Sequence, residues 1–299
     1  MPVVLPAGPP PAPGDGSGLP PALGFVGDVH GDTAALSGVL GRGGALGVTE
    51  WVLLGDLEYR PDDAASRSFL DGLPAIARDH GARLRFVRGN HDDASRLDEL
   101  AQAADGTVEA SPALELLPDG HVFELAGLRF LAAGGASTPA AFRPHDWSAA
   151  EVLGEAALGR CYAAAPVDVV LAHDCPLEVP LRRRNTSWRP GNAHRERLSG
   201  LARALRPRWW ISGHYHERVS ALIDVGGEHP CRVEVLNRSG SGDQQFVVVT
   251  LDALRRSGDD PALRPRRRRS RATVVTVGAA RGSRRDAPGG GRPPPASPR

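Results

Sequence analysis

The sequence predicts an α/β fold in which two sheets pack against each other and are flanked by helices. Short apolar runs alternate with stretches whose apolar residues recur at helical spacing, and the last third of the chain is rich in strand-like runs. The chain has 299 residues, 41% of them hydrophobic, which is enough for one large α/β domain or two small ones.

The first third of the chain predicts a strict alternation of strands and helices. Strands are expected at Leu23–Val26, Trp51–Leu54 and Leu84–Val87 because each is a short run of mainly apolar residues. Apolar residues three or four positions apart predict two intervening helices, the second ending near Gly81. These helices are marked by Leu36, Val39 and Leu40 and by Ala65, Phe69, Leu70, Leu73 and Ile76.

The rest of the chain predicts mostly strands. A hairpin is expected around Ala126 and Gly127, with arms at His121–Leu125 and Leu128–Ala132. Two runs of mainly apolar residues predict buried strands, and three later runs predict a closing antiparallel section. The buried strands are Val167–Ala172 and Trp209–Ser212, and the closing runs are Arg218–Val225, Arg232–Leu236 and Phe246–Leu251.

Both ends of the chain have the composition of disordered segments. Residues 1–21 form a Pro/Gly-rich leader, and residues 255–299 form an Arg/Pro-rich tail with four consecutive arginines at Arg266–Arg269. The folded domain is therefore expected over residues 22–254. The simplest interpretation of the tail is a solvated low-complexity extension, and non-specific binding of nucleic acid is the functional alternative.

Charge and cysteine content favour a cytoplasmic protein without a membrane span. The 36 basic residues are all arginine and are balanced by 35 acidic ones, so net charge predicts no acidic partner for the whole molecule. Cys161, Cys175 and Cys231 are odd in number and form no CxxC pair, which is typical of a reducing compartment. The sequence contains neither a secretory leader nor about 18 consecutive apolar residues.

Polar residues follow five of the predicted strands at the point where each strand ends. Carboxyl ends of strands are where α/β proteins place their sites. Carboxylate, imidazole and amide oxygen ligands without thiolates suit divalent manganese, iron, nickel or zinc and disfavour iron–sulfur and copper(I) sites. The five groups are Gly27-Asp28-Val29-His30-Gly31, Gly55-Asp56, Gly89-Asn90-His91-Asp92, His173, and Gly213-His214-Tyr215-His216.

Two of these groups contain residues two positions apart. If the first strand continues far enough, its period of two points Asp28 and His30 toward the same ion. His214 and His216 have the same spacing, but where a strand breaks into a loop the two imidazoles could diverge toward separate ions.

The ordered set of groups resembles the calcineurin-like metallophosphoesterases, whose pattern is Asp-x-His, Gly-Asp, Gly-Asn-His followed by an acid, a lone His, and Gly-His-x-His. All five blocks occur in order between Asp28 and His216. The resemblance implies a four-layer α/β/β/α sandwich of two mixed sheets with two divalent ions at the sheet edges. By resemblance, Asp28, His30 and His216 would hold the first ion, Asn90, His173 and His214 the second, and Asp56 would bridge them.

The implied activity is hydrolysis of a phosphomonoester or phosphodiester, with Mn²⁺ as the first candidate metal and Fe, Zn or Ni as others. A hydroxide bridging the two ions would attack phosphorus directly. His91 resembles the family's general acid or electrostatic partner for the leaving oxygen, with Asp92 placed to orient it. Arg60 resembles a phosphate-contacting arginine of protein-phosphatase-like members, although Tyr59 replaces the usual acid of that motif.

Three other interpretations stay open at this stage. A protein-phosphatase-like member would act on phosphoprotein, diadenosine polyphosphate or RNA ends, and Arg60 and Arg88 favour it. A non-catalytic metal-binding scaffold is disfavoured because His91, which metal binding does not need, is retained. A nucleic-acid-binding protein would use the basic tail or the Arg182–Arg189 segment, where arginines accompany Trp188, although a solvated loop explains that segment equally well.

Some residues of reactive type receive no role. Cys175 is an unattractive nucleophile because metal-activated water already supplies one. Outside the matched blocks, His145, His194 and His229 are expected to be ordinary surface residues.

Overall fold

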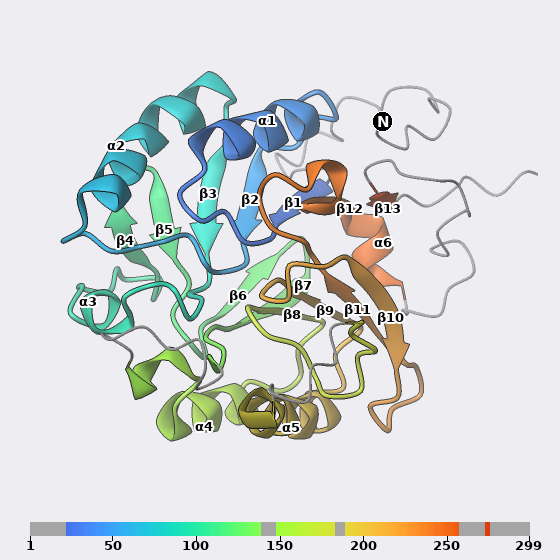
Figure 1. The fold of residues 1–299 in the computed structure, drawn as a ribbon. Helices are drawn as coiled ribbons and strands as arrows, with labels where there is room; N and C mark the ends of the chain where they lie inside the picture. Colours follow the sequence, from blue (N-terminus) through green and yellow to red (C-terminus); the bar gives the residue numbers. More distant parts are fainter. Residues whose placement is uncertain (1–21, 139–147, 183–188, 257–272, 276–299) are drawn as a thin grey trace, which may run out of the picture.

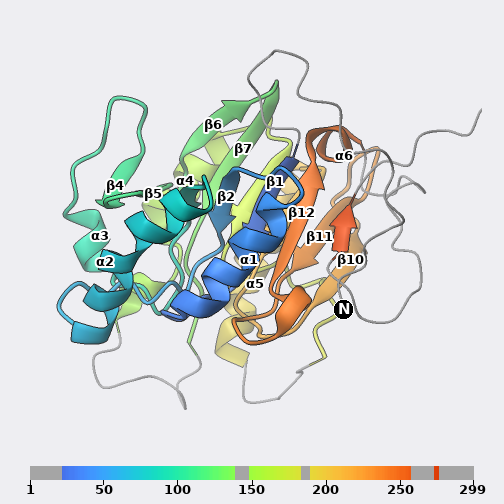
Figure 2. The same cartoon turned by 90° about the horizontal axis from the view of Figure 1, so that it is seen from above.

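The computed structural model describes residues 22–138, 148–182, 189–256 and 273–275. Figure 1 shows four layers: helices α1 (Thr33–Gly44) and α2 (Ala64–Asp79), a first sheet, a second sheet, and helices α4 (Glu155–Ala163) and α5 (Arg189–Leu205). The predicted α/β/β/α sandwich is therefore confirmed. Figure 2 shows the same layers from above, with α1 and α2 lying across the first sheet.

The first sheet is mixed and has seven strands in the order β13-β12-β1-β2-β3-β5-β4. Its strands β1, β2, β3 and β5 run parallel, so the first three bring their carboxyl ends to one edge. Strand β12 pairs with β1 in antiparallel orientation. The strands are β1 (Ala22–Val26), β2 (Glu50–Leu53), β3 (Arg83–Phe86), β4 (Val108–Ser111), β5 (Leu114–Leu116), β12 (Phe246–Thr250) and β13 (Thr273–Val275).

The second sheet is also mixed and has six strands in the order β10-β11-β9-β8-β7-β6. Its central strands β7, β8, β9 and β11 are parallel, while β6 and β10 are antiparallel edges. The strands are β6 (Val122–Leu125), β7 (Leu128–Ala133), β8 (Val169–Ala172), β9 (Trp209–Ser212), β10 (Val219–Ile223) and β11 (Cys231–Val235).

Three apolar interfaces hold the four layers together. The strand period of two sends alternate side chains to opposite faces, which β9 shows clearly. Trp209 and Ile211 pack between the two sheets, whereas Trp210 packs toward α4 and α5. The free cysteines Cys161, Cys175 and Cys231 are fully buried in this last interface between the second sheet and its helices.

The expected strands occur within a few residues of their predicted positions, but the closing section is divided between the sheets. Strands β10 and β11 pair in the second sheet, whereas β12 returns to the first sheet beside β1. The short elements α3 (Ala94–Asp98), η2 (Ala149–Glu151), η4 (Gly242–Gln244) and α6 (Leu251–Arg255) complete the domain.

The leader and most of the predicted tail lie outside the described residues, as does the centre of the Arg182–Arg189 segment. Within the tail, Thr273–Val275 forms β13 and pairs with β12 in parallel, so these three residues depart from the expected disorder. Arg189 begins helix α5, and the backbone N–H of Arg182 donates to Glu217. Among the described helices, none combines the length and apolar character that crossing a membrane requires.

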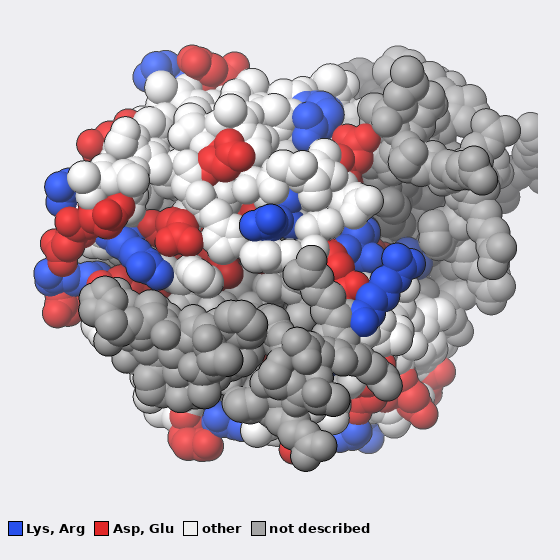
Figure 3. Space-filling model, in the orientation of Figure 1, with Lys and Arg blue, Asp and Glu red and all other residues white. Residues whose placement is uncertain are grey.

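Basic and acidic side chains are interspersed on the described part of one face of the molecule. Figure 3 shows arginines standing beside acidic side chains on the face viewed in Figure 1. Surface pairs such as Arg96 with Asp62, whose nitrogen and oxygen lie 2.6 Å apart, have this character.

Candidate metal centre

Five loops bring polar side chains to one edge of the sandwich. Three of them follow β1, β2 and β3 of the first sheet, and two follow β8 and β9 of the second. Because these strands are parallel within their sheets, their carboxyl ends meet where the sheets face each other. All seven predicted metal-ligating residues lie on these loops: Asp28, His30, Asp56, Asn90, His173, His214 and His216.

A first donor group consists of Asp28, His30, Asp56 and His216, each of which offers one atom within 4.8 Å of the others. The Nε2 atoms of His30 and His216 lie 3.0 Å apart. Asp28 Oδ2 lies 3.1 Å from His216 Nε2, and Asp56 Oδ2 lies 4.0 Å from His30 Nε2. Two imidazole nitrogens and two carboxylate oxygens therefore converge on one point.

A second donor group consists of Asp56, His173 and His214, all of them buried. His173 Nε2 lies 3.1 Å from Asp56 Oδ1 and 3.0 Å from Asn90 Oδ1. Asp56 thus belongs to both groups, with Oδ2 facing the first and Oδ1 facing the second. His214 and His216 fall in different groups, which answers the question that their spacing left open.

Left-handed backbone conformations, and not the strand pleat, bring the side chains together. Strand β1 ends at Val26 and His30 adopts φ 48°, so the strand does not continue as far as the alternation required. Asp28 and His30 nevertheless lie in the same donor group, as expected. Asp56, His214 and His216 also have positive φ, at 50°, 71° and 50°. Such values are uncommon for residues other than glycine and cluster at functional sites.

Glycines allow the loops to approach closely. A Cβ on Gly89 would lie 2.2 Å from Asp56 Oδ1, and a Cβ on Gly213 would lie 2.3 Å from Asp28 Oδ1. Neither position tolerates a side chain without moving a donor. Gly89 and Gly213 are therefore required on steric grounds, because a side chain at either position would displace a carboxylate of the site.

The donors of the second group are held by partners that sequence reasoning missed. His173 Nδ1 lies 2.6 Å from the carbonyl oxygen of Leu54, so Nδ1 donates to this carbonyl and Nε2 is the nitrogen that faces Asp56 and Asn90. Asn90 donates from Nδ2 to Thr138 Oγ1 at 3.0 Å, which turns Asn90 Oδ1 toward His173. Thr138 in turn donates its backbone N–H and its hydroxyl to the buried carboxylate of Glu151 at 2.7 and 2.6 Å.

The electrostatics of the site favour a cation. Burial opposes ionisation of Asp56, but the adjacent His173 holds the pKa of its carboxyl well below the ordinary value. Burial disfavours charged His173, yet Asp56 and Asp28 raise its pKa to about 10. Burial lowers the pKa of His214 to about 4. A divalent cation would neutralise the negative potential of the two carboxylates.

The residues present fit metal ions by a further test. Asp28 Oδ2 is buried and lies 3.1 Å from His216 Nε2, yet it accepts no hydrogen bond within the described part of the chain. A buried carboxylate oxygen without a hydrogen bond is costly. The other oxygen, Oδ1, accepts the backbone N–H of His214 at 2.8 Å. An oxygen left open beside two imidazole nitrogens is what a metal ligand requires.

His91 lies at the open side of the site, with 44% of its side chain exposed. Its backbone N–H donates to Asp56 Oδ1 at 3.0 Å, and its carbonyl accepts from Arg60 Nε at 3.0 Å. The acid next to its ring is Glu58, which sequence reasoning missed, with Oε1 at 3.4 Å from His91 Nδ1.

Asp92 does not orient the His91 ring, contrary to expectation. Its carboxylate is buried and accepts the backbone N–H groups of Tyr59 and Gly89 at 2.8 and 2.7 Å. Asp92 therefore holds the loop that carries Asn90 and His91 against the loop that carries Asp56.

A family comparison decides what this arrangement is. The model of the calcineurin-like phosphoesterase family matches residues 22–218, which contain all the donors described above. The chain belongs to the calcineurin-like phosphoesterase family. The family and the two Asp/His groups together indicate a dinuclear site for divalent metal ions in a metal-dependent phosphoester hydrolase.

Several solved structures resemble this calcineurin-like phosphoesterase at low sequence identity. Protein TT1561 of Thermus thermophilus is 16% identical, with a TM-score of 0.48, over 73% of this chain and 90% of its own. A dimetal phosphatase from Danio rerio is 14% identical, with a TM-score of 0.49, over 73% of this chain and 88% of its own. A phosphopantetheinyl hydrolase from Mycobacterium tuberculosis is 15% identical, with a TM-score of 0.40, over 74% and 91% of the chains.

No curated protein matches the chain. Identities of 14–16% do not indicate a substrate for this phosphoesterase.

The side chain of Arg88 has a structural role in this phosphoesterase. Its guanidinium donates to Asp119 Oδ2 at 2.8 Å and to the carbonyls of Ala150, Glu151 and Val152 at 2.9, 3.1 and 3.0 Å. Arg88 therefore fixes the segment that carries Glu151, and it does not point to the donors. This removes one of the two arginines that favoured the protein-phosphatase-like interpretation.

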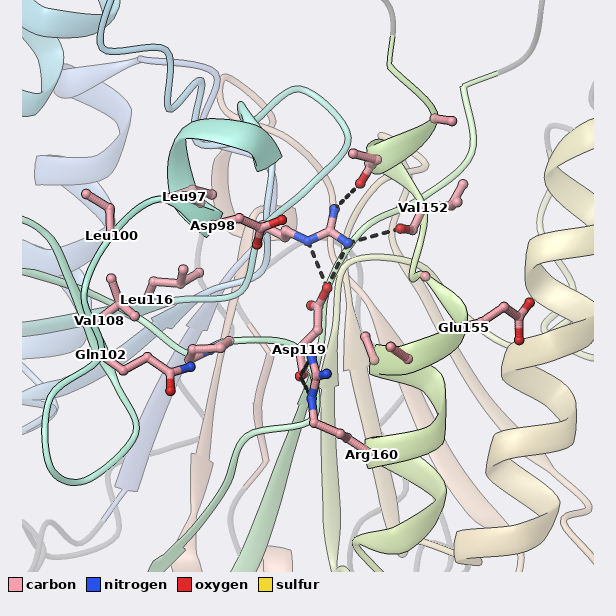
Figure 4. A pocket seen from close by; sticks show the side chains of 17 residues that line it. Leu97, Asp98, Leu100, Gln102, Val108, Leu116, Asp119, Val152, Glu155 and Arg160 are labelled. Atoms are coloured by element: carbon pink, nitrogen blue, oxygen red, sulfur yellow. Dashed lines mark hydrogen bonds and ion pairs between the residues drawn. The ribbon is translucent and has the colours of Figure 1, made fainter.

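A cavity of about 410 Å³ is lined by Arg88 and Asp119 together with residues from both sides of them in the chain. Figure 4 shows Leu97, Leu100 and Leu116 on one wall and Glu155 and Arg160 on the other. None of the seven donors lines it, so donor chemistry, and not this cavity, locates the active site.

His194 is not the surface residue that was expected. It is 4% exposed, and its Nδ1 lies 3.0 Å from Asp174 Oδ2. Asp174 also accepts the Tyr215 hydroxyl at 2.7 Å, so residues adjacent to His173 and His214 are joined beneath the site. His229 is exposed as expected, and His145 lies outside the described residues.

Proposed function

We propose that the chain hydrolyses a phosphomonoester or phosphodiester at two Mn²⁺ ions. Asp28, His30 and His216 would hold the first ion, Asn90, His173 and His214 the second, and Asp56 would bridge them. The observation that carries this proposal is the sharing of Asp56, whose two oxygens face two separate donor groups. The bound ions would supply Lewis acidity toward a phosphoryl oxygen and an activated water.

The protein's own groups would bind and orient the ester. His91 lies beside Asp56 with its ring partly exposed, and we assign it to the leaving oxygen, as a proton donor or by electrostatic stabilisation. Arg60 follows Asp56 on the same loop and braces the carbonyl of His91, which places its guanidinium next to the site. The mixed oxygen and imidazole donor set suits Mn²⁺ and equally Fe, Zn or Ni, and Mn²⁺ is the first ion to be tested.

A protein-phosphatase-like activity on phosphoprotein, diadenosine polyphosphate or RNA ends is the second candidate. Arg60 alone now favours it, through its contact with His91. Arg60→Ala is expected to raise KM for such substrates more than for an aryl phosphate. Unchanged kinetics of Arg60→Ala across a panel of these substrates would exclude this candidate.

The proposed function is tested by stripping the protein with chelator and adding back Mn²⁺, Ni²⁺, Zn²⁺ or Mg²⁺. Turnover of para-nitrophenyl phosphate and bis-para-nitrophenyl phosphate is then compared with that of the Asp56→Asn and His91→Ala variants. His229→Ala is the matched control, because His229 is exposed in the turn between β10 and β11. We expect metal-restored turnover in the wild type and control only, whereas metal-independent turnover, or full activity in Asp56→Asn, would refute the proposal.

A further inference from the structure

Glu58 places one carboxylate against three functional side chains. Its Oε1 lies 2.9 Å from Nδ1 of His30 and 3.4 Å from Nδ1 of His91. Its Oε2 lies 3.5 Å from Nε of Arg60. The three residues come from the loops after β1, β2 and β3, so Glu58 contacts each of the three donor-bearing loops of the first sheet.

The local sequence explains why the acid stands at position 58. The next residue, Tyr59, is committed to the core: it is 4% exposed, stacks on Phe86, and donates its hydroxyl to the carbonyl of Ala110. Position 59 therefore cannot present an acid to the site. Glu58 instead adopts φ 69°, and its carbonyl accepts the hydroxyl of Ser66 at 2.6 Å, which holds this left-handed turn.

The contact with His30 determines which ring nitrogen faces the donors. A carboxylate beside Nδ1 favours the tautomer with hydrogen on Nδ1 and leaves Nε2 as the lone-pair nitrogen. Nε2 of His30 is the atom that lies 3.0 Å from His216 Nε2 in the first donor group. Glu58 thus has the same role beside His30 as the Leu54 carbonyl has beside His173: each places an oxygen next to Nδ1 of the ring.

The same oxygen faces His91, whose role differs. The rings of His30 and His91 meet edge to face with centroids 5.3 Å apart, and Glu58 Oε1 lies within reach of both. Asp92 is used by backbone amides, so Glu58 is the carboxylate that faces the His91 ring. Part of the ring is exposed, and a carboxylate at Nδ1 limits its rotation.

We propose that Glu58 is a positioning residue that orients two histidines of different function, His30 toward the first metal ion and His91 toward the leaving oxygen. One carboxylate then couples metal binding to leaving-group assistance. The His91 half of this inference rests on the proposed function, whereas the His30 half requires only that the site binds metal.

The test compares Glu58→Gln, which keeps the length and an acceptor oxygen, with Glu58→Ala, which removes the carboxylate. Glu99→Gln is the matched control, because Glu99 is exposed and pairs only with Arg96 among the described ion pairs. Far-UV circular dichroism and thermal unfolding establish that each variant is folded. Metal affinity is measured by equilibrium dialysis, and the imidazole tautomers of the Zn²⁺-loaded protein by ¹⁵N NMR.

For the His30 half, we expect Glu58→Ala to lower metal affinity roughly 10- to 100-fold, with Glu58→Gln in between and Glu99→Gln unchanged. The Nδ1–H signal of His30 should shift in Glu58→Ala. Wild-type affinity together with an unshifted His30 signal in Glu58→Ala would overturn this half.

For the His91 half, kcat is measured at saturating metal with aryl phosphates of good and poor leaving groups. We expect Glu58→Ala to reduce kcat more for the poor leaving group, and we expect this reduction to vanish in a His91→Ala background. Equal losses with and without His91 would show that Glu58 does not act through it. If the wild type hydrolysed no ester, the proposed function and the His91 half would fail together, while dialysis and NMR would still decide the His30 half.

Discussion

At the scale of single residues, Asp56 is the side chain on which both donor groups depend. Its carboxylate faces His30 with one oxygen and His173 with the other, and it also accepts the backbone N–H of His91. Its backbone carbonyl separately accepts the N–H groups of Val29 and His30 at 3.1 and 2.8 Å. The side chain of Asp56 faces the donor groups, whereas its backbone carbonyl holds the loop that follows β1. A substitution of the side chain can therefore change the donor groups and leave this backbone contact in place.

Asp56→Asn is expected to abolish catalysis without unfolding the protein. The amide keeps the size and one acceptor but removes the charge that two cations would share, which costs several kcal/mol of transition-state stabilisation, or at least about a hundredfold in kcat. Steady-state kinetics at several metal concentrations, with circular dichroism as the folding check, measure this. Kinetics within about threefold of wild type would contradict the bridging role.

Thr138→Val is expected to weaken metal binding from outside the donor set. The change removes the acceptor that holds the Asn90 amide and leaves Glu151 with one fewer donor, so affinity for one of the two ions should fall by roughly 10- to 100-fold. Thr138→Ser is the control because it retains the hydroxyl. Competitive metal titration distinguishes them, and equal affinities in the two variants would show that the hydroxyl is dispensable.

The sequence predicted the residues whose type carries metal chemistry but missed those whose role depends on position. The seven donors were recognisable because Asp, Asn and His followed strands in a fixed order. Thr138 and Glu151 act only because Arg88 and the chain fold bring them beneath Asn90, and no local pattern marks them. Glu58 could have been found from the sequence. Tyr59 occupies the position of the acid in the family motif, and Glu58 is an acid one residue earlier.

At the scale of elements, strands were easier to predict than the helices that cover the second sheet. Apolar runs such as Val169–Ala172 are conspicuous, because a strand buried on both faces needs no polar residues. Helices α4 and α5 carry few large apolar residues among many Ala, Gly and Arg, which hid their apolar faces. Tertiary packing against Trp210 and its neighbours, and not a strong local pattern, stabilises these helices.

Leu201→Ala tests that dependence on packing. Leu201 is fully buried on α5 against the second sheet, so its truncation is expected to reduce the free energy of unfolding by about 2–5 kcal/mol. Arg203→Ala on the same helix removes a surface ion pair with Glu178 and should cost less than about 1 kcal/mol. Urea unfolding followed by tryptophan fluorescence compares them, and similar losses in both variants would contradict this account of α5.

At the scale of the whole molecule, the metal centre joins the two sheets. Asp28, His30, Asp56 and Asn90 follow strands of the first sheet, whereas His173, His214 and His216 follow strands of the second. Each donor group contains residues from both sheets. Ions bound there would connect the halves of the sandwich in addition to the apolar interface between them.

Removal of metal is therefore expected to lower thermal stability as well as activity. Ligand present at a hundred times its dissociation constant stabilises the native state by about 2.7 kcal/mol. For a domain of this size that corresponds to a rise in Tm of roughly 5–10 °C. Differential scanning calorimetry with chelator and with added Mn²⁺ measures the difference. As a control, the Tm of Asp56→Asn is expected to be the same with and without metal. If the Tm of the wild type were also unchanged by metal, the ions would not connect the two sheets.

The three buried thiols provide a built-in probe of how often the molecule opens. Cys161, Cys175 and Cys231 lie in one interface, between the second sheet and its helices, and burial raises the pKa of each thiol. A thiol reagent can reach them only when that interface opens, so the rate of alkylation reports the opening free energy of one side of the sandwich without any introduced label. Comparing that rate with and without metal would reveal how far the stabilisation by the ions extends from the loops into the helical layer.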